Sequence, residues 1–183
     1  MPVSATTPQV FYTSGILYAA QLGEYEKGIE YFQKIVDTWP GYEFAWHAQF
    51  YVGQYYERLK HSGAIPDAEA DPKIEQAYKA VLDSYPASMS ASHAAMRLGQ
   101  ISSEKGQWSD AATYLEIFLK MNQGGTPSLV LGALDSAGRA CERLGQVDKA
   151  KDRYEMFIQI AEPSDPRLKN VKLRLEQLQG EVQ

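Results

Sequence analysis

The chain has 183 residues, of which 44% are hydrophobic and 22% are charged, and its formal net charge is −5. This composition is typical of a folded soluble protein with one sizeable core or a short repeat array. The acidic balance argues against a nucleic-acid-binding protein, because no basic stripe is available to neutralise phosphates.

No apolar run approaches the roughly 18 residues that a bilayer-spanning helix needs, so we expect no membrane insertion. Cys141 is the only cysteine, which excludes an internal disulfide and fits either a reducing compartment or the periplasm. Residues 1–9 lack the charged and apolar regions of a signal peptide, although a signal or anchor can be removed before a sequence is recorded. The compartment therefore stays open between periplasm and cytoplasm.

The first predicted helix pair covers residues 10–40, after a flexible lead over residues 1–9. Its first helix is expected to run to Leu22, and its second helix ends before Pro40. The first helix departs from the pattern of the later pairs, because Ile16 stands where they carry glycine.

The second pair covers residues 42–86 and contains an insertion at residues 61–71, which we predict to be a loop. Asp71 is expected to cap the following helix and Pro72 to be its first residue. A surface insertion of this kind is either functional or tolerated decoration, and decoration is the favoured interpretation.

The third pair, residues 88–123, shows the pattern most clearly. Gly99 and Gly106 are seven residues apart, and Ala111 follows five residues later. Small residues before Gly99 let a second helix approach closely, and Gly106 suits a left-handed helix cap. The segment Gly124–Pro127 is expected to end the pair.

The fourth pair, residues 128–163, repeats these intervals at Gly138, Gly145 and Ala150. An amphipathic helix over residues 165–179 follows, and residues 180–183 form a tail. Its apolar stripe and charged opposite face predict a helix that caps the end of a repeat array.

These intervals resemble those of the tetratricopeptide repeat (TPR) family over one domain, residues 10–179. The resemblance implies an all-α solenoid of about four helix-turn-helix repeats with a carboxyl-terminal capping helix. The thirteen-residue links from Pro40 to Gly53 and from Pro86 to Gly99 are similar to those of bacterial cell-envelope TPR proteins. That group includes the Tol-Pal-associated coordinator and the β-barrel assembly lipoprotein, whose lipid-attachment cysteine this chain lacks.

The resemblance also implies that the first helices of the pairs line a concave groove. On the family pattern, groove-facing side chains lie six and three residues before the first-helix glycine and one and five residues after it. These positions, with Arg97 beside them, are His47, Phe50, Gln54 and Arg58 in the second pair, His93, Met96, Gln100 and Glu104 in the third, and Gly132, Asp135, Arg139 and Arg143 in the fourth.

In this groove Phe50 and Met96 would supply an apolar floor, and the arginines would hold carboxylates of a partner. The alternative is that the arginines are solvated or pair with Glu104 and Glu142. The pattern does not match the lysine-asparagine clamp of chaperone-binding TPR domains. Most of the tyrosines, together with Trp39 and Trp108, are expected to pack between helices.

Catalytic and metal sites are not expected. His47 and His93 occupy equivalent places in consecutive pairs, but no carboxylate or thiolate stands at ligand spacing with both. Cys141 occupies a packing position, and the chain carries no G-x-S-x-G, H-E-x-x-H or phosphate-binding glycine loop. The sequence therefore predicts a protein without cofactor, metal or enzymatic activity.

Two functions stay open. The first is a scaffold that binds a peptide or protein segment in the groove. The second is a self-assembling structural protein that oligomerises through its first helix, where no preceding helix covers Tyr12, Ile16, Tyr18 and Ala19.

Overall fold

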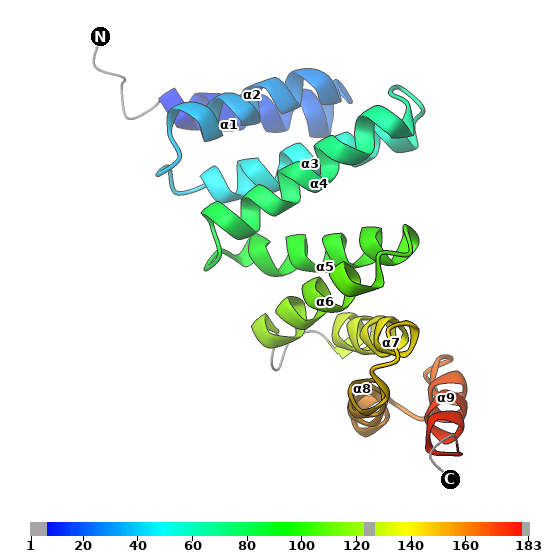
Figure 1. Ribbon diagram of the computed structural model, residues 1–183. Helices are drawn as coiled ribbons and strands as arrows, with labels where there is room; N and C mark the ends of the chain where they lie inside the picture. Colours follow the sequence, from blue (N-terminus) through cyan, green and yellow to red (C-terminus); the bar gives the residue numbers. More distant parts are fainter. Residues whose placement is uncertain (1–6, 123–126, 181–183) are drawn as a thin grey trace. The chain divides into compact units, whose positions relative to one another are not determined.

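The computed structural model describes residues 7–122 and 127–180, and these residues are almost entirely helical. In chain order the helices are α1 (Thr7–Ile16), α2 (Tyr25–Thr38), α3 (Ala45–His61), α4 (Asp67–Ser84), α5 (Met89–Glu104), α6 (Trp108–Met121), α7 (Pro127–Arg143), α8 (Val147–Ile160) and α9 (Leu168–Gly180), with a short π-helix, η1 (Leu17–Gln21), directly after α1 (Figure 1). The predicted all-α series of helix pairs is confirmed. The structure does not describe residues 1–6 of the predicted lead, residues 123–126 before α7 or residues 181–183 of the predicted tail.

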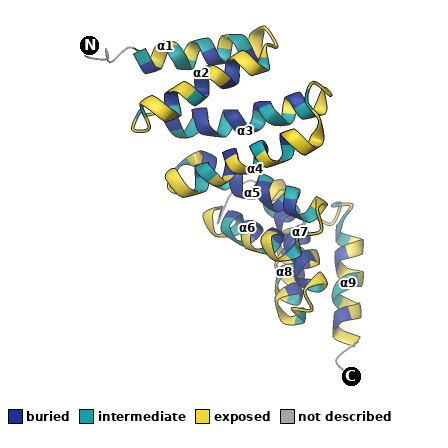
Figure 2. Cartoon of the chain, turned by 45° about the horizontal axis from the view of Figure 1, so that its top comes forward, coloured by how far each residue is buried: buried dark blue, intermediate teal, exposed yellow. Residues whose placement is uncertain are grey.

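The chain divides into two compact units, Met1–Ala94 and Ala95–Gln183, which we call the amino-terminal unit and the carboxyl-terminal unit. Helix α5 begins in the first and ends in the second. Within the units, α2 packs between α1 and α3, and α7 packs between α6 and α8. Buried residues follow the faces where these helices meet, and exposed residues gather at the turns (Figure 2).

A glycine in each first helix allows the second helix of the pair to lie against its backbone. A Cβ atom at Gly99 would lie 2.7 Å from Cγ of Leu115, and one at Gly53 would lie 2.7 Å from Cε1 of Tyr78. Gly138 has the same relation to Tyr154. The predicted close approach at these glycines is therefore confirmed, and no larger residue fits there without moving a helix.

In the first pair, the repeat intervals place the first-helix glycine position at Ile16, and this prediction was wrong by one residue. Gly15 takes the place of the first-helix glycine, because a Cβ atom there would lie 2.7 Å from Cε1 of Phe32. Gly15 and Gly23 are eight residues apart, one more than in the third and fourth pairs. The π-helix η1 takes up this extra residue, with a hydrogen bond from the Leu22 amide to the Leu17 carbonyl at 3.1 Å.

The predicted loop at residues 61–71 is also corrected. Helix α3 continues to His61, a turn follows at Gly63 with φ of +73°, and α4 already begins at Asp67. Pro72 therefore lies inside α4, where it removes one backbone hydrogen bond without ending the helix. Asp71 does not cap the helix and instead accepts a hydrogen bond from Lys60 Nζ at 2.6 Å. The insertion extends α3 further past its glycine than α5 and α7 extend past theirs, and it makes α4 18 residues long against 14 in α6 and in α8.

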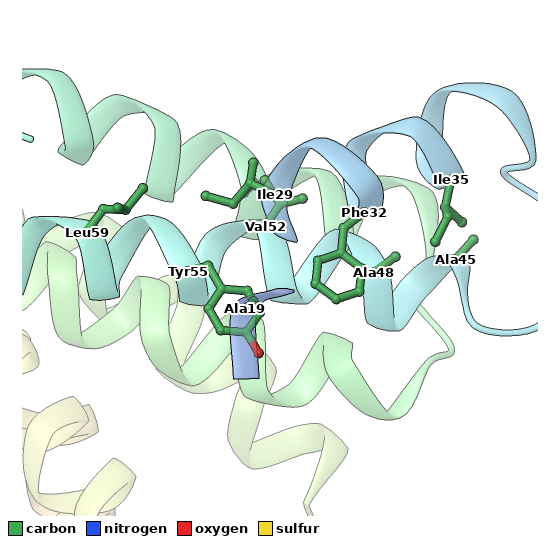
Figure 3. Packing of buried hydrophobic residues seen from close by; sticks show 10 residues of the cluster. Ala19, Ile29, Phe32, Ile35, Ala45, Ala48, Val52, Tyr55 and Leu59 are labelled. Carbon is green, nitrogen blue, oxygen red and sulfur yellow. The ribbon is translucent and has the colours of Figure 1, made fainter. Parts of the chain in front are cut away.

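The core of the amino-terminal unit lies where α2 meets α3 (Figure 3). Phe32 and Ile35 of α2 are fully buried against Ala45 and Ala48 of α3, and Tyr55 stacks on Phe32 with ring centroids 6.0 Å apart. Alanines on α3 leave room for the large side chains of α2. The two helices therefore interdigitate as large side chains against small ones.

The core of the carboxyl-terminal unit joins α7, α8 and α9. Tyr154 and Phe157 of α8 are fully buried, and Val171 and Leu178 of α9 cover them. Lys172 and Leu173 of α9 are exposed, whereas Val171 and Leu178 are buried, so α9 packs against the unit with one face.

Two helical glycines of the carboxyl-terminal unit give a matched test of this packing. We expect Gly99→Ala to lower the free energy of unfolding by about 1–3 kcal/mol, because the new methyl group meets Leu115. Gly132→Ala should raise it by about 0.5–1 kcal/mol, because its methyl group meets Arg167 and Met96 only at 3.6 and 3.8 Å. Urea unfolding measures both, and equal stability of the two variants would contradict the packing described.

Candidate functional site

The predicted groove residues of the amino-terminal unit are partly engaged with aromatic neighbours. Nδ1 of His47 on α3 lies 2.7 Å from the Tyr12 hydroxyl of α1. Burial and nearby tyrosines raise the pKa of Tyr12 to about 12, so its hydroxyl stays protonated and forms a neutral hydrogen bond with Nδ1. His47 also stacks on Tyr51, with centroids 4.2 Å apart. The histidine thus ties α1 to α3, and its pKa is lowered by burial.

The other groove residues of this unit are less enclosed. Phe50 contacts Tyr78 and His93, with centroids 5.3 and 6.1 Å away. Gln54 is half-buried and Arg58 is exposed. The predicted apolar floor divides between the units, because Phe50 belongs to the amino-terminal unit and Met96, which is buried, to the carboxyl-terminal unit. His47 packs against Tyr12 and Tyr51, whereas His93 packs against Phe50.

The carboxyl-terminal unit contains a polar pocket of about 320 Å³. Helices α5, α6, α7 and α9 each contribute to its wall, which consists of Ser103, Glu104, Trp108, Ser136, Arg139, Glu142, Arg143 and Arg174. Of these, Glu104, Arg139 and Arg143 were predicted to face the groove, and the two arginines to bind a partner. We call this cavity the arginine pocket.

Each arginine of the pocket has a defined neighbour. Arg139 donates two hydrogen bonds to the Asp135 carboxylate, at 3.0 and 2.9 Å. The Arg143 guanidinium lies over the Trp108 ring, 5.5 Å from its centroid. Arg174 of α9 donates to Glu142 at 2.6 Å. The side chain of Arg139 is still 48% exposed, so its outer edge remains accessible to a ligand.

These pairings bear on the alternative that the groove arginines are solvated or pair with Glu104 and Glu142. Glu142 binds Arg174 rather than an arginine of its own helix, and Arg139 binds Asp135. Beyond the pocket, Arg97 of α5 donates a hydrogen bond to Gln100. Arg174 was missed from the sequence, because α9 stands outside the repeats and no spacing rule relates it to Glu142.

A buried phenol lies near Glu142 and Arg174. The Tyr154 hydroxyl is fully buried, and no described atom meets hydrogen-bond geometry with it. Burial raises the pKa of Tyr154, and the nearby Glu142 carboxylate raises it further. The hydroxyl therefore remains a neutral donor beside the Glu142–Arg174 pair.

The described residues hold no group of three histidine, cysteine or acidic side chains that could bind a metal ion. Burial raises the pKa of the Cys141 thiol, which disfavours the reactive thiolate. Across residues 7–122 and 127–180, none of the helices combines the length and apolarity needed to cross a bilayer. A guanidinium group can donate paired hydrogen bonds to a carboxylate.

The lowered pKa of His47 predicts a stability change with pH. Because the unfolded histidine binds a proton more readily than the folded one, the free energy of unfolding should fall as the pH drops below about 6.5. We expect His47→Gln to reduce this fall, whereas His61→Gln, at an exposed position on α3, should keep it. Urea unfolding between pH 8 and pH 5, at about half-unit steps, compares the three proteins; parallel profiles for all would contradict the expectation.

This chain resembles known proteins in the sequence of one repeat and in its fold. Residues 9–42 match a family model described as tetratricopeptide repeat. They form the first pair, whose first helix departs from the glycine spacing of the later pairs. No curated protein sequence matches the chain.

Many solved structures are similar in fold, among them the following two. One is PilW, a widely conserved type IV pilus biogenesis factor, with 18% identity and a TM-score of 0.59 over 90% of this chain. The match covers 66% of PilW, so this chain spans about two thirds of that structure. The other is a putative kinesin light chain of Podosopora anserina with TPR-like repeats, with 18% identity and a TM-score of 0.55, covering 94% of this chain and 87% of that one. The chain thus carries a tetratricopeptide repeat at residues 9–42, and its fold is that of TPR helical-repeat proteins.

Proposed function

We propose that this chain is a non-catalytic scaffold that binds a segment of a partner protein, with the arginine pocket as the anchoring site. TPR folds generally mediate protein–protein interaction, which supports the general role. The observation that carries the specific proposal is the convergence of Arg139, Arg143 and Arg174 on one pocket of about 320 Å³. A cavity of this size accommodates one or two side chains of a peptide.

The pocket favours an acidic segment. Of the three guanidinium groups in its wall, Arg139 is paired with Asp135 and Arg174 with Glu142, and the third belongs to Arg143. Arg143 is the best placed to bind a ligand carboxylate, because its neighbour is the ring of Trp108 rather than an acidic side chain. Ser136 adds a hydroxyl that can donate to the same ligand.

The remaining predicted residues extend the proposal along the first helices. Gln54, Phe50 and Arg58 on α3 would contact the partner in the amino-terminal unit, and Gln100 and Arg97 on α5 in the carboxyl-terminal unit. The fold shared with a type IV pilus biogenesis factor supports a bacterial cell-envelope setting for such a partner. The net charge of −5 supports a protein partner over a nucleic acid.

Arg143→Gln offers the cleanest test of the pocket, since Arg139→Gln or Arg174→Gln would leave a carboxylate without its cation. The probe is a fluorescein-labelled decapeptide library with a fixed Asp or Glu pair. We expect Arg143→Gln to weaken the best binders about tenfold or more, because charged hydrogen bonds contribute about 1.5–3 kcal/mol. Fluorescence anisotropy measures the dissociation constants.

Lys172→Gln is the matched control, since it removes one exposed positive charge from α9 outside the pocket. It should leave binding almost unchanged. The proposal is wrong if both variants weaken binding equally, or if peptides with Asn and Gln at the fixed positions bind as tightly as the acidic ones.

A further inference from the structure

The wall of the arginine pocket holds two opposite charges that no ion pair neutralises. Two of its arginines, Arg139 and Arg174, are paired with carboxylates. The remaining cation is Arg143, whose neighbour is an aromatic ring. The remaining anion is Glu104, whose side chain makes no hydrogen bond or ion pair with any residue in 7–122 and 127–180.

Glu104 and Arg143 occupy equivalent places in consecutive repeats. Glu104 is the last residue of α5 and lies five residues after Gly99, whereas Arg143 is the last residue of α7 and lies five residues after Gly138. Because the repeats share one register, both side chains reach the same cavity. No ion pair joins them to each other, so both charges stay available to a ligand.

The position of Glu104 is electrostatically unfavourable within the chain. The last turn of an α-helix presents carbonyl groups without intrahelical partners and the negative end of the helix dipole, where a cation is preferred. Helix α5 has no basic residue in its last turn, and Lys105, which follows it, does not line the pocket. Helix α7, in contrast, ends on the basic residue Arg143. A ligand cation beside Glu104 would therefore stabilise both the carboxylate and the end of α5.

The size of the cavity limits how far apart the charges of a ligand lie. Its volume of about 320 Å³ holds one or two side chains, so a carboxylate at Arg143 and a cation at Glu104 would come from neighbouring residues of one segment. A segment with two acidic residues would bring its second carboxylate toward Glu104, where like charges repel. A mixed pair of residues is thus the ligand that complements both groups.

We propose that the arginine pocket recognises a protein segment in which an acidic residue stands directly beside a Lys or Arg, with Arg143 binding the carboxylate and Glu104 binding the cation. This inference rests on the proposed function, since it requires Arg143 as the anchor. It makes Glu104 the residue that sets specificity between a mixed segment and a uniformly acidic one.

The test compares three fluorescein-labelled decapeptides that differ only at two central positions, which hold Asp and Lys, Asp and Gln, or two Asp residues, each in both residue orders. Fluorescence anisotropy measures the dissociation constants. The peptide with Asp and Lys should bind about threefold more tightly than the one with Asp and Gln, because it adds one ion pair. The peptide with two Asp residues should bind more weakly than either. Equal affinity of the three would overturn the inference.

Glu104→Gln separates this contact from the general attraction of a cationic peptide to an acidic chain. The variant should bind the peptides with Asp and Lys and with Asp and Gln equally tightly. Glu155→Gln is the matched control, because Glu155 is exposed on α8 and none of the described lining residues comes from that helix. It should keep the preference for Lys. Any other outcome for the two variants would overturn the inference. Glu104 is also exposed, so its variant should fold, which circular dichroism checks.

Arg143→Gln distinguishes a failure of this inference from a failure of the proposed function. If Arg143→Gln weakens the binding of all three peptides and Glu104→Gln leaves the preference for Lys unchanged, the anchor stands and the role of Glu104 is refuted. Peptide binding that Arg143→Gln does not weaken would contradict the anchor and the inference with it. In Glu104→Lys the order should reverse, so that the peptide with two Asp residues binds most tightly.

Discussion

The fold depends on the contact between a glycine in each first helix and a large side chain of the second helix. Phe32, Tyr78, Leu115 and Tyr154 each occupy the space where a Cβ atom would otherwise stand. Because the same contact recurs in every pair, it sets a common register for the remaining faces of the helices. That register places the core and the candidate binding residues of the first helices at fixed intervals from one glycine.

The regular pairs were predictable from sequence because their glycine intervals agree. Gly99 with Gly106, and Gly138 with Gly145, repeat one spacing, and the structure gives both turn glycines a positive φ. Gly15 was missed because η1 adds one residue before the turn and shifts the pattern. Gly63 was missed because α3 and α4 are longer than the template, and a repeat pattern has no position for additional helical turns.

The candidate site was predictable only where it follows the repeat. Arg139 and Arg143 lie on α7 at the expected positions, and the structure brings both into the arginine pocket. Arg174 was not predictable, because its contact with Glu142 spans 32 residues and joins a repeat helix to the capping helix. Helical i,i+4 spacing makes the Asp135–Arg139 pair predictable, whereas no spacing rule relates Tyr12 to His47.

The most direct test of the binding account follows the arginine side chains themselves. In a ¹⁵N-labelled protein titrated with an acidic decapeptide, the Nε–Hε resonances of Arg143 and Arg174 should shift together and saturate. The resonance of Arg153, which pairs with Glu116 outside the pocket, should stay in place. Peptide binding that shifts the Arg153 resonance but leaves those of Arg143 and Arg174 unchanged would contradict the account.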